Sequence, residues 1–152
     1  MYSPRHESAM REEFWTSFGR YVSPILSANG KKISWVNYKT GIKNIQFKMN
    51  AGKSGAIINI EITGDAEKIN KFFSLFLSFK PAFVKVFEHN WKWVPEMVQL
   101  DGRVIANIFC SLEKVSIFNK EDWPALITFF KSNIILLDEF WIRHKEIFQI
   151  IA

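Results

Sequence analysis

The sequence predicts an α+β fold in which one domain, residues 1–152, packs an antiparallel sheet of about five strands against helices. A length of 152 residues suits one hydrophobic core. The spacing of apolar residues changes along the chain between four, as in helices, and two, as in strands. Glycine-containing turns separate the segments with strand spacing. Together these observations predict the element order αβββαββα.

The first predicted helix has one apolar face, because apolar residues recur every four positions from Met10 to Val22. Charged and polar residues fill the positions between them. We expect this helix to end near Ser23, because Pro24 disfavours a helical backbone at the residue before it.

Alternating apolar residues then predict three strands, which we expect to pair as an antiparallel meander. Segments 39–41 and 52–55 contain glycines suited to the tight reversals between them. The predicted strands contain Ile33 and Trp35, Ile45 to Met49, and Ile58 to Ile62.

A second helix follows Asp65, which is placed to cap it. Its apolar stripe runs from Ile69 to Phe79, and we expect Pro81 to kink or split it, because proline interrupts the hydrogen bonds of a helix interior.

The last third of the chain predicts a hairpin and a final helix. Asp101-Gly102 is a strong signal for a hairpin turn between two strands. We expect Trp91 and Trp93, on one face of the first of these strands, to be buried against a helix. The final helix begins around Pro124, since proline fits the first turn.

Positive charge is concentrated in the first part of the chain. The protein carries 20 Lys and Arg against 15 Asp and Glu, a net charge of +5. The excess lies within residues 1–60, and no carboxylate occurs between Glu13 and Glu61. Such asymmetry is typical of a surface that meets nucleic acid or anionic lipid, and it also suits simple solubility.

This carboxylate-free region is the candidate binding surface. Lysines neutralise phosphates without reading bases, and aromatic rings can stack on bases. Four to six phosphate contacts predict a log–log salt slope of roughly −4 to −5. The alternative is that the lysines only solvate the hairpin and discourage pairing of exposed strand edges. The candidate residues are Lys39, Lys43, Lys48 and Lys53, with Trp35 and Tyr38 as stacking groups.

A second interpretation is a degenerate restriction-nuclease-like fold. Such nucleases hold Mg²⁺ with an acidic residue on one strand and a Glu-x-Lys motif on the next. Here Glu61-Ile62-Thr63 stands at the motif and Asn50 at the first acid, so ligands are missing. We expect Lys48 to approach Glu61 across the hairpin as a structural pair. A third alternative is a module for protein interaction or self-association.

No pattern in the sequence indicates catalysis, a cofactor or a metal. Cys110 alternates with apolar neighbours, so we expect a core residue and not a nucleophile. The histidines, His6, His89 and His144, lack zinc spacing. We therefore expect no cofactor, no metal site and no enzymatic activity.

Composition also indicates a cytoplasmic protein without a membrane span. A single cysteine cannot form an internal disulfide, and the first residues lack the apolar run of a secretory signal. The densest apolar run, residues 134–137, is far shorter than the roughly 18 residues that a membrane helix needs.

Three segments of the sequence, taken together, are more distinctive than the amino-acid composition. They are Glu12-Glu13-Phe14-Trp15 with Phe18-Gly19-Arg20, then Trp35 to Gly41, then Phe118 to Pro124 followed by Asp138-Glu139-Phe140-Trp141. From about Arg11 to Phe148 the chain resembles a bacterial family of unknown function that carries the number 4268. The resemblance implies a module that stands alone or follows a restriction-nuclease-like domain, with no activity of its own.

The family commonly has an acidic residue where Asn50 stands, and this departure weakens any carboxylate role further. We therefore expect a non-catalytic accessory or interaction module. Its partner would be nucleic acid or another protein.

Overall fold

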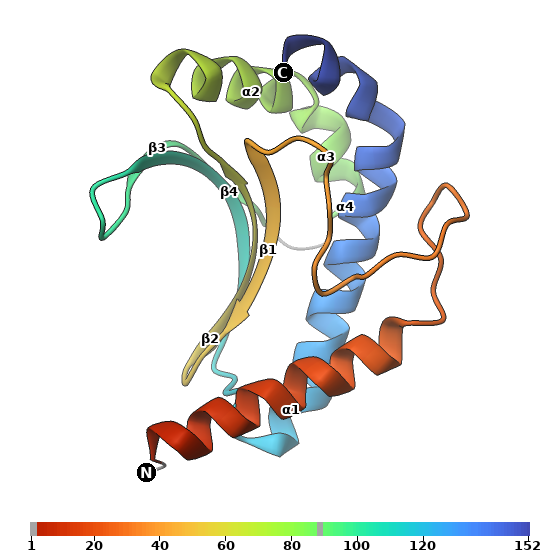
Figure 1. The fold of residues 1–152 in the computed structure, drawn as a ribbon, viewed down its shortest axis with the longest axis vertical. Coiled ribbons are helices and arrows are strands. Elements are labelled where there is room, and N and C mark those ends of the chain that lie inside the picture. The colour runs from red at the N-terminus through yellow and green to blue at the C-terminus, as the bar shows by residue number, and fades with distance from the viewer. Residues whose placement is uncertain (1–2, 88–89) are drawn as a thin grey trace.

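Within residues 3–87 and 90–152, which the computed structural model describes, a four-stranded antiparallel sheet carries the fold (Figure 1). The strands are β1 (Ile45–Ala51), β2 (Gly55–Ile62), β3 (Lys92–Val98) and β4 (Val104–Glu113). Their order is β1-β2-β4-β3, so two hairpins lie side by side and join through β2 and β4. The predicted α+β class is confirmed.

The helices are α1 (Pro4–Val22), α2 (Ala66–Ser78), α3 (Lys80–Val86) and α4 (Trp123–Ile151), with a short 3₁₀ helix, η1 (Lys120–Asp122), before α4. Pro81 stands in the first turn of α3, so it splits the second helical region as predicted. Asp65 caps α2 by accepting a hydrogen bond of 2.8 Å from the Lys68 amide. Figure 1 shows α4 running beside the curved sheet, with α2 at one end and α1 at the other.

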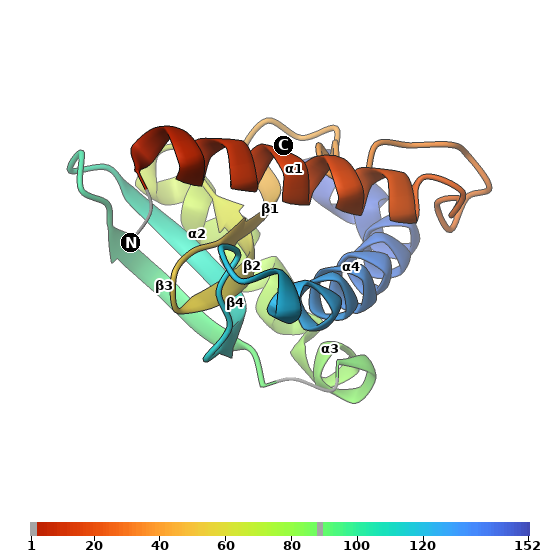
Figure 2. The ribbon, with the colours of Figure 1, turned by 90° about the horizontal axis from the view of Figure 1, so that it is seen from below.

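Apolar side chains of both halves of the chain form one core between the sheet and the helices. Ile58, Ile60 and Ile62 of β2 are fully buried there. The predicted apolar face of α1 is confirmed, and the helix crosses the start of α4, as Figure 2 shows from below. At this crossing the ring of Phe14 lies 5.3 Å from that of Trp123, centroid to centroid.

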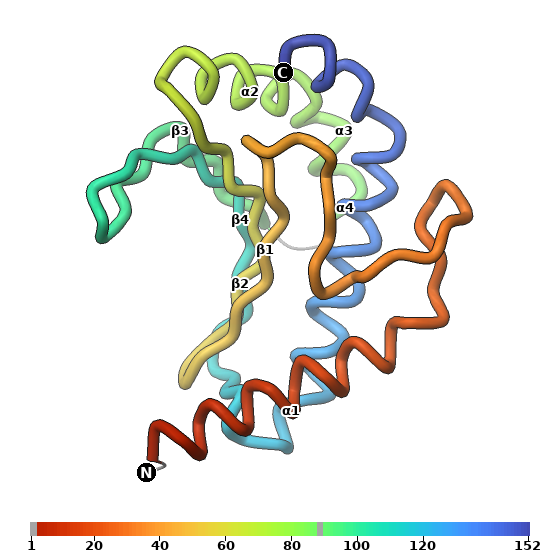
Figure 3. Tube along the Cα trace, in the orientation of Figure 1, coloured from red at the N-terminus to blue at the C-terminus, as the bar shows by residue number. Residues whose placement is uncertain are grey.

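The prediction of a strand at Ile33 and Trp35 is wrong. Residues 23–44 form an irregular segment that passes between α4 and β1 (Figure 3). The sheet of the described residues therefore has four strands and not about five, and the meander shrinks to the β1–β2 hairpin. Trp35 is nevertheless buried in the core, and its indole N–H donates to the carbonyl of Ile25, 2.9 Å away, inside this segment.

The second hairpin, β3 and β4, forms as predicted, but Trp91 precedes β3 and only one of the two tryptophans is fully buried. Gly102 adopts a positive φ of 86° in the turn, which glycine tolerates best. Trp91 is buried and meets the ring of Phe83 edge-on at 5.2 Å, whereas Trp93 is half-buried. Each helix of the described residues lacks the length or apolar content that a membrane span requires.

Candidate functional site

A buried carboxylate fastens the irregular segment to α4. Asp138 is only 1% exposed and accepts hydrogen bonds from the hydroxyl of Ser27 at 2.8 Å and the amide of Ala28 at 2.8 Å. The hydroxyl of Tyr38 donates a third, at 2.5 Å. Three donors offset the cost of removing a carboxylate from water, so the site fixes the path of residues 27–38 against the helix.

Tyr38 is held on two sides. Its ring stacks on that of Phe47 in β1, with the centroids 5.2 Å apart, while its hydroxyl reaches α4. Burial, the hydrogen bond to Asp138 and the charge of that carboxylate raise the pKa of the phenol far above its usual value. The hydroxyl therefore remains a protonated donor at neutral pH.

Two further contacts continue this attachment. The indole N–H of Trp141, a buried residue of α4, donates to the carbonyl of Thr40 at 2.8 Å. The hydroxyl of Thr40 in turn donates to the carbonyl of Ile45 at 2.6 Å, at the start of β1. The backbone on both sides of Lys39 is thus anchored at Tyr38 and at Thr40, which determines where this lysine leaves the surface.

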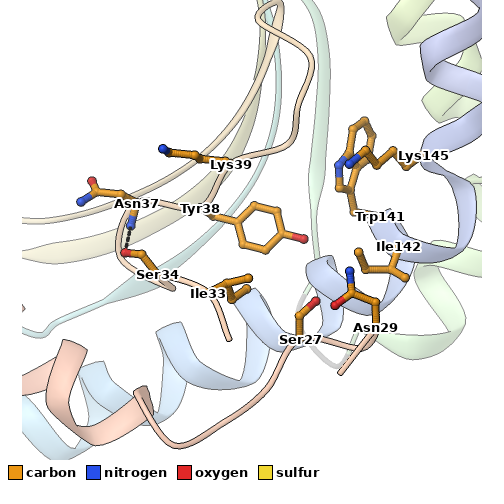
Figure 4. Close-up of a pocket in the computed structure, with 10 residues that line it drawn as sticks. All are labelled: Ser27, Asn29, Ile33, Ser34, Asn37, Tyr38, Lys39, Trp141, Ile142 and Lys145. Carbon is orange, nitrogen blue, oxygen red and sulfur yellow. Dashed lines mark hydrogen bonds between the residues drawn. The ribbon is translucent and has the colours of Figure 1, made fainter. Parts of the chain in front are cut away.

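Two hollows flank the anchored backbone. The first, called the inner pocket below, has a volume of about 290 Å³ and lies between the irregular segment and α4 (Figure 4). The second, called the groove, has a volume of about 700 Å³ and lies along residues 36–50. Asn37, Tyr38 and Lys39 line both, so the two hollows adjoin.

Three lysines line these hollows without a carboxylate partner. Lys39 and Lys43 are exposed at the groove, and Lys145 of α4 lines the inner pocket, which Lys39 lines from the irregular segment. Among the ion pairs of residues 3–87 and 90–152, none involves Lys39, Lys43 or Lys145. Their positive charge is therefore not cancelled by a direct partner in the described structure.

The other two candidate lysines, Lys48 and Lys53, form ion pairs with glutamates. The ammonium of Lys48 lies 2.7 Å from the carboxylate of Glu61, which confirms the expected approach across the hairpin. The ammonium of Lys53 lies 3.4 Å from that of Glu7 in α1, although 69% of the Lys53 side chain is exposed. Of the four predicted lysines, Lys39 and Lys43 thus keep an unpaired charge.

The two predicted stacking groups, Trp35 and Tyr38, do not form an exposed platform on which bases could stack. Trp35 is 2% exposed, so no base can reach the face of its ring in this structure. Tyr38 is half-buried, with one face against Phe47. The candidate site therefore includes the lysines but not Trp35.

The charge pattern of the sequence did not indicate Lys145, because the excess of basic residues lies within residues 1–60. The signal that could have found it is the helical spacing of Asp138, Trp141 and Lys145, which places the three on one face of α4. Two of them contact the irregular segment directly.

The face of the sheet that points away from Ile58, Ile60 and Ile62 carries polar side chains at the positions where the nuclease pattern has its metal ligands. Glu61 is 7% exposed and paired with Lys48, and the amide of Asn59 donates to Asn107 at 2.9 Å. Asn50 is exposed. In the part of the chain that the structure describes, no group of three or more His, Cys, Asp or Glu residues could hold a metal ion.

Burial raises the pKa of the Cys110 thiol to about 11, as suits a core residue. His89, one of the histidines considered from the sequence, lies outside the described residues.

The chain belongs to a family defined as a domain of unknown function, DUF4268, whose model matches residues 10–145. Neither a curated protein nor a solved structure matches the chain. The family resemblance seen in the sequence is thereby confirmed.

Proposed function

We propose that this member of the DUF4268 family is a non-catalytic module that contacts the phosphate backbone of nucleic acid. The observation that carries the proposal is the gathering of Lys39, Lys43 and Lys145 around two adjoining hollows without carboxylate partners among the described residues. Unpaired ammonium groups attract phosphates and release the counterions that surround a nucleic acid.

The chemistry of the groove favours contact with the backbone over reading of sequence. Lysine acts as a point charge on phosphate, whereas base readout favours the bidentate fork of arginine. The side chains of Asn37, Gln46 and Asn50 are exposed along the groove and can donate to phosphate or sugar oxygens. We expect weak binding that depends little on sequence.

Because Lys48 and Lys53 form ion pairs within the protein, we expect weaker binding to nucleic acid. Three or four phosphate contacts, in place of four to six, predict a log–log salt slope of roughly −2 to −3 for a single strand. A protein with this slope binds measurably at low salt and loses its ligand as the salt concentration rises.

Fluorescence anisotropy with short labelled DNA and RNA, at two salt concentrations, tests the proposal. The double variant Lys39→Glu/Lys43→Glu is expected to bind at least tenfold more weakly than the parent, because it reverses two charges at the groove. The matched control is Lys85→Glu/Lys92→Glu, which makes the same change in net charge on exposed positions of α3 and β3. It should retain most of the binding.

Equal losses in both double variants would show that only net charge matters. Negligible binding by every form would overturn the proposal and favour a protein partner. Cleavage of DNA that requires Mg²⁺ and disappears in Glu61→Gln would overturn the non-catalytic part.

A further inference from the structure

The inner pocket differs from the groove in being closed on one side. Trp141 and Ile142 of α4 form its back wall, and residues 27–38 of the irregular segment form the other side (Figure 4). A polymer can lie along an open groove, but only an end of the chain fits a pocket that is closed at the back. Its volume of about 290 Å³ suits a group of the size of one nucleotide or smaller.

Two nitrogen donors face this pocket. The Oδ1 atom of Asn29 accepts a hydrogen bond of 3.0 Å from the amide of Lys31. This contact fixes the orientation of the side chain, so that its NH₂ group is turned toward the hollow, and Figure 4 shows the ammonium of Lys145 at the opposite end. No hydrogen bond or ion pair of the described residues occupies either nitrogen.

The hydroxyl groups at the base of the pocket contribute less. Both Ser27 and Tyr38 use their protons on Asp138, so they present only lone pairs to a ligand. Ser34 accepts from the amide of Asn37 at 3.2 Å, and its own proton is available to a ligand oxygen. The donors available to an anion therefore come from Asn29, Ser34 and Lys145, with Lys39 at the edge shared with the groove.

We propose that the inner pocket binds the terminal phosphate monoester of a nucleic-acid strand whose backbone lies in the groove. This inference rests on the proposed function and names the part of the strand that the site recognises. A monoester carries a charge of about −1.5 to −2 at neutral pH and three acceptor oxygens, whereas an internal diester carries one charge. The ammonium of Lys145, which forms no ion pair among the described residues, therefore attracts the monoester more strongly than the diester.

Apolar side chains complete the pocket. Ile33 and Ile142 line it beside the polar groups, so the sugar or base of the last nucleotide can pack against them while its phosphate meets Lys145. Lys39 lies where the pocket and the groove adjoin, and it is placed for the next phosphate of the strand.

The test compares oligonucleotides of one sequence that carry a 5′-phosphate, a 3′-phosphate or hydroxyls at both ends. The parent protein is expected to bind one of the phosphorylated strands about tenfold more tightly than the unphosphorylated strand. Asn29→Asp keeps the acceptor for the Lys31 amide but replaces the NH₂ donor by a negative charge, and Lys145→Gln removes the cation. Both variants should lose the preference for the terminal phosphate, while Lys85→Gln, an exposed control in α3, should keep it.

Equal binding of all three strands by the parent would overturn this inference and leave backbone contact standing. Absence of binding to any strand would overturn both proposals. If both Asn29→Asp and Lys145→Gln retain circular dichroism spectra like the parent's and still prefer the phosphorylated strand, the phosphate lies elsewhere. A free nucleoside monophosphate that binds as tightly as the phosphorylated strand would assign the pocket to a small ligand and overturn the proposal of a strand end.

Discussion

The hydroxyl of Tyr38 donates a hydrogen bond of 2.5 Å to the carboxylate of Asp138, a residue one hundred positions later in the chain. This contact joins the irregular segment to α4 at the place where the inner pocket and the groove adjoin. It does not touch the proposed phosphate donors directly. It holds the backbone from which Lys39 projects, so the geometry of the binding surface depends on a buried hydrogen-bonded carboxylate.

Removing this hydrogen bond is expected to destabilise the fold. Tyr38→Phe leaves the buried carboxylate with one donor fewer, and the free energy of unfolding should fall by about 1–3 kcal/mol in urea denaturation. The matched control is Tyr21→Phe, because Tyr21 is 56% exposed. It should change stability by less than about 0.5 kcal/mol. A Tyr38→Phe protein as stable as the parent would show that the contact contributes nothing.

The same pair predicts a loss of stability at alkaline pH. Burial and the neighbouring Asp138 raise the pKa of Tyr38 in the folded protein above its ordinary value of about 10, which applies to the unfolded chain. Below about pH 10 the phenol is protonated in both states, and its contribution is complete. Above that pH the unfolded chain releases the proton while the folded protein retains it, so the free energy of unfolding falls.

Urea denaturation between pH 8 and 11 checks this expectation. Cys110, whose pKa is raised to about 11 by burial, adds a decline of the same sign, so the comparison is made with Tyr38→Phe. The variant should show a shallower decline than the parent. Parallel curves for the two proteins would refute the assignment to Tyr38.

Two tryptophans provide a comparison of satisfied and unsatisfied indole groups. The N–H of Trp141 donates to Thr40, whereas the buried N–H of Trp91 has no hydrogen-bond partner in the described structure. Trp141→Phe should therefore destabilise the protein more than Trp91→Phe, by about 1 kcal/mol or more, since it also leaves the Thr40 carbonyl unpaired. Thermal unfolding of the two variants measures the difference, and a larger effect at Trp91 would contradict it.

Local patterns predicted most of the regular elements. The apolar spacing of Met10 to Val22, the turn at Asp101-Gly102 and the interruption at Pro81 each act through neighbours a few residues away. These features could therefore be predicted from the sequence without knowledge of the tertiary structure. The strand expected at Ile33 and Trp35 failed for the opposite reason, since the conformation there depends on a carboxylate in α4.

Only part of the candidate site could be predicted from the sequence. A deficit of carboxylates in the sequence identified Lys39 and Lys43, but it could not show that Glu61 and Glu7 approach Lys48 and Lys53 in the folded chain. The burial of Trp35 could not be predicted from the sequence either, because an aromatic residue between Ser34 and Val36 suits either a surface or a core. Tertiary contacts, not local preference, decide which of these charges and rings remain available.

The salt dependence of nucleic-acid binding tests the central claim most directly. We predict that the logarithm of the association constant falls with the logarithm of salt concentration with a slope of roughly −2 to −3 for a single strand. In Lys39→Gln/Lys43→Gln the slope should become shallower by about 0.7 for each lysine removed. A flat salt dependence in the parent, or an unchanged slope in the variant, would contradict a phosphate-binding surface built on these lysines.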